Sequence, residues 1–130
     1  EEAADIGTVA ALELTDWLFP AYRQVGCLLY RGYPLESAVS QLYGANCDET
    51  KGRMMPCHHS SKAFRFVNPS SVIGTQIVHA AGAGLAAKLR GESTVSVGYF
   101  GDGATSSNDF HSALTFAGVY KTQTVFVCIN

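Results

Sequence analysis

The sequence has few charged residues and no concentration of either sign. Only 15% of its 130 residues are Asp, Glu, Lys or Arg, and the formal net charge at pH 7 is −2. The nine Lys and Arg residues are scattered, so the sequence offers neither a basic track for nucleic acid nor a basic patch for an anionic membrane. Partners of these two classes are not expected.

Long apolar runs are also missing. The longest candidate, residues 25–35, is interrupted by Arg31, so no membrane span is expected. The first residues, Glu1 to Asp5, lack the basic and apolar regions of a secretory signal.

Cysteine is sparse, and its spacing contains no C-x-x-C pair. The four cysteines are Cys27, Cys47, Cys57 and Cys128. Cys27 and Cys128 stand in apolar surroundings, which is typical of reduced core cysteines, and a reducing compartment is therefore expected.

Apolar residues, by contrast, make up 47% of the chain, enough for one packed domain over residues 1–130. Two apolar runs, 95–100 and 124–129, read as strands, and the segment between them reads as a glycine turn and a helix. That order predicts a parallel crossover in an α/β fold. It places the glycine turn at the carboxyl end of a strand, where open parallel sheets bind ligands.

The remaining segments are expected to be mostly helical. Residues 7–30 show a helical period, with Thr8 as a plausible N-cap and Pro20 as a point where the helix kinks or divides. A short helix over 34–44 and a helix over 75–89 are predicted, separated by an irregular stretch, 45–70. Long irregular stretches in compact domains are often functional.

The glycine turn places Asp102 between Gly101 and Gly103, at the entrance to a helix. Ser106 and Asp109 resemble a capping box, and free N–H groups at a helix start can cradle a phosphate. A carboxylate beside a phosphate calls for a divalent cation such as Mg²⁺. An ordinary strand-to-helix turn with an exposed aspartate explains the glycines equally well. A dinucleotide fold does not, because the glycine order is wrong and no acid follows residues 124–129.

The turn and the residues after it carry a specific resemblance. Gly101-Asp102-Gly103 is followed by 26 residues (104–129) and then Asn130. This resembles the signature of thiamine-diphosphate enzymes, and in particular the alpha chain of the decarboxylating component of 2-oxo acid dehydrogenase complexes. The resemblance covers most of the chain, with YRQVGCLLYRGYPLE, KGRMMPCHHSS and SSVIGTQIVHAAGAGLAAK similar to the branched-chain member. The pyruvate enzymes usually have Gly-Gly-Ser-Met-His where this chain has residues 52–58.

The resemblance implies a thiamine-diphosphate-binding fold with a central parallel sheet flanked by helices. Residues 1–130 would be its diphosphate-binding part, truncated and inactive alone. The implied activity is that of 3-methyl-2-oxobutanoate dehydrogenase: oxidative decarboxylation of branched-chain 2-oxo acids with acyl transfer to lipoyl groups. A pyruvate or acetoin dehydrogenase alpha subunit, or a non-catalytic fragment retaining only the fold, are the alternatives.

The resemblance also implies partners. The active protein would be an α₂β₂ heterotetramer whose beta subunit supplies the glutamate that activates the cofactor. A lipoyl-bearing transacylase would receive the acyl group. The location would be the mitochondrial matrix in a eukaryote and the cytoplasm otherwise.

Residue roles are implied by position. The residues matched to thiamine diphosphate are Tyr22, Arg23, Ser71, Ile73, Gly101, Asp102, Gly103 and Ala104. Asp102 also matches a Mg²⁺ ligand, and Ser70, Val72, Thr75 and Gln76 match a K⁺ loop. His58 matches a histidine at the active-site mouth, and is the one catalytic residue proposed. Without the family, Arg23 would be a solvated cation and residues 70–76 a Ser/Thr-rich helix start.

Some positions depart from the family or have competing readings. The family usually has Ser-Glu-Gly-Asp where this chain has residues 106–109, and its second motif asparagine would follow Asn130. Cys57, His58 and His59 do not form a zinc site, because adjacent side chains rarely converge and no partner pair has the spacing. His111 is expected to be structural, and His79 to lie on a helix surface or an interface.

Overall fold

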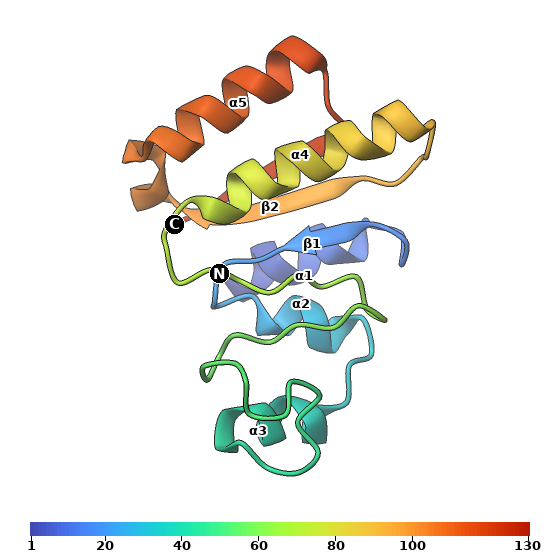
Figure 1. The fold of residues 1–130 in the computed structure, drawn as a ribbon, viewed down its shortest axis with the longest axis vertical. Coiled ribbons are helices and arrows are strands. Elements are labelled where there is room, and N and C mark those ends of the chain that lie inside the picture. The colour runs from blue at the N-terminus through green and yellow to red at the C-terminus, as the bar shows by residue number, and fades with distance from the viewer.

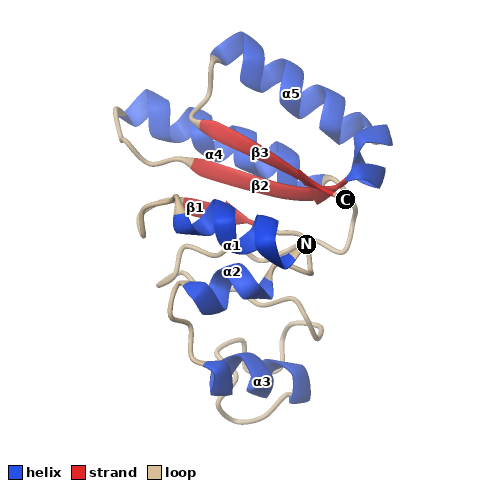
Figure 2. Ribbon diagram, turned by 180° about the vertical axis from the view of Figure 1, so that it is seen from behind, coloured by secondary structure: helices blue, strands red, loops and turns tan.

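The core of the fold is a sheet of three parallel strands. The computed structural model describes all of residues 1–130. The strands follow the order β1 (Trp17–Phe19), β2 (Ser96–Gly101), β3 (Thr124–Ile129), and all neighbours are parallel (Figure 2). The α/β class and the parallel crossover between residues 95–100 and 124–129 are therefore confirmed.

Helices cover both faces of this sheet. One pair is α4 (Thr75–Arg90) with α5 (Asn108–Tyr120), which Figure 1 shows on the β2 side of the sheet, toward the top of the view. The other pair is α1 (Glu2–Ala10) with α2 (Val25–Tyr30), which lies beside and below β1 in the same view. The prediction of a helix over 75–89 is confirmed by α4.

The side chains of β2 explain the two layers. Val97 and Tyr99 belong to the apolar cluster that includes α1 and α2, whereas Phe100 belongs to the cluster with α4 and α5. Successive residues of a strand point to opposite faces, so this one strand supplies both cores. A Cβ atom at Gly98 would lie 3.1 Å from the Cβ of Ala80, so α4 lies close against the sheet at that point.

The first thirty residues are not one helix, and the prediction over 7–30 is wrong there. The structure has α1, β1 and α2 in that segment. Residues 17–19 form an apolar triplet that fits a helical period, but they pair with β2 in the sheet. Pro20 does divide the segment, since it follows β1 directly. Thr8 is not an N-cap; it lies inside α1, and its hydroxyl lies 2.9 Å from that of Tyr99.

The turn before β1 is fixed by a buried carboxylate. Asp16 is 5% exposed, and its two oxygens accept hydrogen bonds from the amides of Glu13 at 2.9 Å and Val95 at 2.8 Å. The Arg31 guanidinium donates to the carbonyls of Asp16, Glu13 and Phe64 nearby. Burial lowers the pKa of Arg31, and Asp16 partly opposes that shift.

Asp16→Asn is expected to lower the free energy of unfolding by about 1–2 kcal/mol, because one of the two amides then faces an NH₂ group and is left unpaired. Urea denaturation of the full-length chain measures this. Glu13→Gln alters a neighbouring side chain that is exposed, and serves as the control. Equal stability of both variants would contradict a structural role for the Asp16 carboxylate.

The short helix predicted over 34–44 is confirmed as α3 (Leu35–Tyr43), which ends at Gly44 in a left-handed conformation. The irregular stretch 45–70 is also confirmed, as it contains no helix or strand. Its turns are held by local contacts. The Gln41 amide donates to the carbonyl of Met55 at 2.7 Å, so the stretch is tied back to α3.

The cysteines divide by location. All four are free thiols, and Cys27 is fully buried, where burial raises the pKa of its thiol to about 11. Cys128 is exposed, so its prediction as a core residue is wrong. It lies on β3, most of whose residues are only partly covered in this chain.

None of the helices combines the length and the apolar character that a bilayer span needs.

Candidate functional site

A cavity of about 420 Å³ lies at the carboxyl ends of β2 and β3. Gly101 and Ile129 are register partners at those ends, so Asp102 and Asn130 follow on adjacent strands. The cavity is lined by residues from five parts of the chain: Glu1, Ala21, Tyr22, Arg23, Gln24, Ser70, Ile73, Gln76, Phe100, Gly101, Asp102, Gly103, Ala104, Ile129 and Asn130. This is the position predicted for a ligand in an open parallel sheet.

The glycine turn forms one wall of the cavity. β2 ends at Gly101, and residues Asp102–Ser106 form a 3₁₀ turn, η1. Neither Gly101 nor Gly103 has a positive φ, so unusual backbone angles do not explain them. No atom lies within 4 Å of a Cβ placed at Gly103, so within this chain a side chain would meet open space. The turn thus leaves room for a ligand to approach its backbone.

The helix after the turn begins one residue later than predicted. Ser107, not Ser106, is the N-cap of α5, and its hydroxyl accepts a hydrogen bond from the amide of Phe110 at 3.2 Å. The capping box of Ser106 with Asp109 is therefore wrong. The reason is the 3₁₀ turn, which takes up residues through Ser106 before the α-helix starts.

The Asp102 side chain is exposed and available. Its backbone carbonyl accepts a hydrogen bond from the Thr105 hydroxyl at 2.7 Å, but its carboxylate makes no hydrogen bond or ion pair within the chain. A charged oxygen group facing a cavity without an internal partner is suited to bind a cation.

The cavity is also lined by a cationic side chain. Arg23 lines the cavity beside Tyr22, and its guanidinium carbon lies 5.9 Å from the centre of the Tyr22 ring. The guanidinium also pairs with the Glu1 carboxylate at 3.2 Å. Both partners are substantially exposed, so this ion pair is weak and leaves Arg23 able to exchange its partner for an anion.

The segment before α4 is divided between two cavities. Ser70, Ile73 and Gln76 line the first. Ser70 and Thr75 also line a second cavity of about 370 Å³. Gln76 is buried and donates to the carbonyl of Tyr99 at 2.8 Å, while the Val72 amide donates to the Ser70 hydroxyl at 3.1 Å. Val72 lines neither cavity.

His58 and Ser71 come together in the second cavity. The Nε2 atom of His58 lies 2.7 Å from the Ser71 hydroxyl, and its Nδ1 lies 3.0 Å from the carbonyl oxygen of Pro56. Ser71 therefore does not line the same cavity as the other residues matched to the cofactor.

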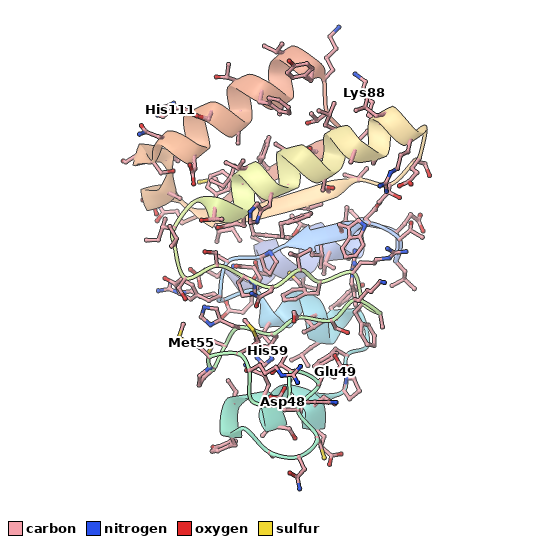
Figure 3. All side chains as sticks on the ribbon, viewed as in Figure 1. Asp48, Glu49, Met55, His59, Lys88 and His111 are labelled. Carbon is pink, nitrogen blue, oxygen red and sulfur yellow. The ribbon has the colours of Figure 1, made fainter.

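The polar residues of the irregular stretch are mostly structural. Burial alone would raise the pKa of Asp48, but hydrogen bonds from the Gly52 amide and from the hydroxyl and amide of Thr50 lower it. His59 is buried near Asp48 (Figure 3), and burial lowers the pKa of His59. No three His, Cys, Asp or Glu side chains gather into a metal-binding group.

The other histidines lie on helix surfaces. His111 is exposed on α5, on the far side of the molecule from His59 (Figure 3), and contacts the Phe110 ring edge-on. His79 is exposed on α4, as predicted, and lines the second cavity.

Sequence reasoning missed part of the cavity wall. Phe100 and Ile129 are the last apolar residues of two predicted strands, and strand ends in a parallel sheet were a usable signal. Gln24 is 4% exposed, and the Oε1 atom of its side-chain amide has no hydrogen-bond partner. Nothing in the sequence marked Gln24 or Glu1, because their places in the cavity depend on how α1 and α2 pack.

Comparison with known families decides the relationship. The sequence model of the family "Dehydrogenase E1 component" matches residues 1–130, the whole chain. The chain belongs to this family. The resemblance inferred from the glycine turn and Asn130 is thereby confirmed.

Relatives of this E1 component chain point to one branch of the family. It is 45% identical to the mitochondrial 2-oxoisovalerate dehydrogenase subunit alpha of Mus musculus, across all of this chain and 29% of the relative. It is 42% identical to subunit alpha 2 of Arabidopsis thaliana, covering 28% of it, and 41% identical to the subunit of Dictyostelium discoideum, covering 30%. The chain thus spans under a third of the length of these relatives, and its similarity to the branched-chain member is confirmed.

Proposed function

We propose that this chain is the diphosphate- and metal-binding part of a thiamine-diphosphate site in a branched-chain 2-oxo acid dehydrogenase alpha subunit. One observation carries the proposal. A single cavity brings together every residue matched to the cofactor except Ser71, although these residues come from segments far apart in the sequence. The names of the similar proteins support the branched-chain substrate.

The cavity suits a diphosphate. Arg23 offers a guanidinium that can hold two phosphate oxygens, and its present partner Glu1 is a weakly held surface acid. The open space at Gly103 allows the phosphate to approach the backbone of the turn. Tyr22, beside Arg23, is matched to the same group.

The metal would be Mg²⁺ beside the diphosphate. Asp102 lines the cavity and has a carboxylate without an internal partner, and the family's second motif asparagine, the other matched ligand, would follow Asn130. Oxygen ligands of this kind, completed by phosphate and water, are what Mg²⁺ prefers. The cation would also remove the repulsion between Asp102 and the diphosphate.

The apolar part of the cofactor would contact Ile73, whose side chain lines the cavity and is 64% exposed. Thiamine diphosphate, when bound, supplies the electron sink that 2-oxo acid decarboxylation needs.

No carboxylate of this chain is matched to the cofactor's aminopyrimidine, so a beta subunit in an α₂β₂ assembly would supply that carboxylate. The acyl group would pass to a lipoyl-bearing transacylase.

A monovalent cation would order the entrance to α4. Ser70, Val72, Thr75 and Gln76 are the proposed K⁺ ligands. The Ser70 hydroxyl already accepts a hydrogen bond from the Val72 amide, and the hydrogen bond from Gln76 to the Tyr99 carbonyl fixes the Gln76 side-chain amide in place.

Location in the mitochondrial matrix, for a eukaryotic source, is supported by the relatives, which are named mitochondrial.

Calorimetry tests the proposal. The full-length chain, assembled with its beta subunit, is titrated with thiamine diphosphate with and without Mg²⁺, and turnover is measured with 3-methyl-2-oxobutanoate and with pyruvate. Mg²⁺-dependent binding and preference for the branched substrate are expected. Preference for pyruvate would move the chain to the sibling enzyme, and no binding would identify a non-catalytic relative.

A further inference from the structure

Arg23 uses only part of its guanidinium in this structure. Its Nη1 atom donates a hydrogen bond to the Glu1 carboxylate at 3.2 Å, and the guanidinium forms no other hydrogen bond within the chain. A guanidinium binds an oxyanion best through two parallel N–H groups. The Glu1 carboxylate is therefore bound less fully than a bidentate anion would be.

The Glu1 side chain has no other attachment. Its carboxylate accepts this one hydrogen bond, and although Glu1 stands at the N-cap position of α1, its side chain does not cap the helix. The Glu1 side chain is 39% exposed and that of Arg23 is 64% exposed, so water solvates most of the ion pair and the pair contributes little. Rotation of the Glu1 side chain is enough to release Arg23.

The charges of the first cavity bear on what an anion meets there. Among the lining side chains, Glu1, Arg23 and Asp102 are the ones charged at neutral pH, so two carboxylates stand against one guanidinium. An anion that reaches Arg23 meets the Glu1 carboxylate on the same guanidinium, and like charges at such short separation repel each other. The anion and the Glu1 carboxylate are therefore expected to exclude each other at Arg23.

We propose that Glu1 competes with the diphosphate for Arg23. Its carboxylate holds the guanidinium in the empty cavity and is displaced when the diphosphate binds, so Glu1 lowers the affinity for the cofactor. This inference rests on the proposed function, because it assigns Arg23 to the diphosphate. The two acids of the cavity thus have opposite effects: Asp102 supports binding through the metal, and Glu1 opposes binding whether or not the metal is present.

Glu1→Gln tests the proposal, because it removes the charge and keeps the size of the side chain. Glu2→Gln is the matched control, since the Glu2 side chain is 98% exposed and does not line the cavity. Both variants are made in the full-length chain, assembled with the beta subunit and titrated calorimetrically with thiamine diphosphate, in chelator and at saturating Mg²⁺. Glu1→Gln is expected to bind about three- to tenfold more tightly than Glu2→Gln in both conditions, because the competing ion pair and the repulsion are both removed.

The other outcomes each overturn the proposal. Weaker binding by Glu1→Gln in both conditions would mean that Glu1 stays on Arg23 and positions it while the cofactor is bound. Weaker binding with Mg²⁺ and tighter binding in chelator would make Glu1 a metal ligand. Binding equal to that of Glu2→Gln would mean that Glu1 and the diphosphate do not compete.

Arginine labelling tests the Glu1–Arg23 pair without cofactor or turnover. Phenylglyoxal adds to guanidine groups, and mass spectrometry of peptides reports each arginine separately. Arg23 is expected to react about two- to fivefold faster in Glu1→Gln than in Glu2→Gln, because a guanidinium held by a carboxylate is less available. Arg90, which pairs with Glu92 at 3.8 Å, is the internal reference and is expected to react equally in both variants. Equal reaction of Arg23 would overturn the pair itself, whereas a wild-type assembly that binds no thiamine diphosphate would overturn the proposed function and leave the labelling contrast intact.

Discussion

Asp102→Asn is expected to weaken Mg²⁺-dependent binding of thiamine diphosphate by about 100-fold or more. Changes in groups that only support a metal ligand already cost about 10–100-fold, and Asp102 is proposed to bind the metal directly. Asparagine keeps the size of the side chain and one oxygen, but it removes the charge that Mg²⁺ requires. Calorimetric titration of the assembled enzyme at saturating Mg²⁺ measures the loss.

The same substitution should act in the opposite direction when the metal is removed. Without Mg²⁺, the Asp102 carboxylate faces the diphosphate directly, and two anions a few ångströms apart repel each other. In the presence of a chelator, Asp102→Asn is therefore expected to bind thiamine diphosphate more tightly than the wild type. A reversal of sign with the metal is difficult to produce by misfolding, because an unfolded site would lose binding in both conditions.

Asp109→Asn is the matched control. It makes the same change of charge in the first turn of α5, a few residues along the chain, but Asp109 does not line the cavity. Its binding is expected to stay within about fivefold of the wild type, because a charge at a helix start contributes only about 0.3–1 kcal/mol. If both variants bound as the wild type does at saturating Mg²⁺, Asp102 would not be a metal ligand.

The carboxyl-terminal third of the fold could be predicted because its signals are local and agree. Two apolar runs of strand length flank a glycine turn and an amphipathic segment, and the parallel pairing of β2 with β3 follows from that order. Asp102 and Asn130 follow those two strands directly, so their presence in one cavity was also accessible from the sequence.

The first thirty residues show where local signals fail. Residues 17–19 are apolar and fit a helical period, yet their place as β1 is set by pairing with Ser96 to Gly98, nearly eighty positions away. A three-residue strand is too short for alternation to show. Tertiary pairing outweighed the local pattern.

The site shows a second kind of limit. Resemblance to the family implies that Ser71 contacts the cofactor; in this chain the Ser71 hydroxyl lies 2.7 Å from Nε2 of His58 in the second cavity, while Ser70 and Ile73 line the first. Gln24 entered the wall through the packing of α2, and Glu1 through its pair with Arg23. Which of several adjacent polar residues faces a ligand depends on backbone angles that the sequence does not specify.

Gly84→Val is expected to destabilise the chain by about 3 kcal/mol, at the upper end of the range for overpacking a tight contact. Gly84 is buried in α4 where the helix crosses the start of β3. A Cβ at that position would lie 2.7 Å from the backbone oxygen of Gln123 and would clash with the Thr124 hydroxyl. Because the nearest obstacle includes backbone, no side-chain rotation relieves the clash, and the helix would have to move off the sheet.

Hydrogen exchange of the full-length chain locates the effect. Amides of α4 and β3 in Gly84→Val are expected to exchange about 100-fold faster, since 1.4 kcal/mol corresponds to about tenfold. Gly82→Val is the matched control in the same helix: no atom lies within 4 Å of its Cβ position, so its exchange should match the wild type. Equal protection in both variants would mean that α4 does not depend on this contact. Loss of protection in Gly84→Val alone would show that α4, the helix that includes Gln76, can pack against the sheet only because residue 84 has no side chain.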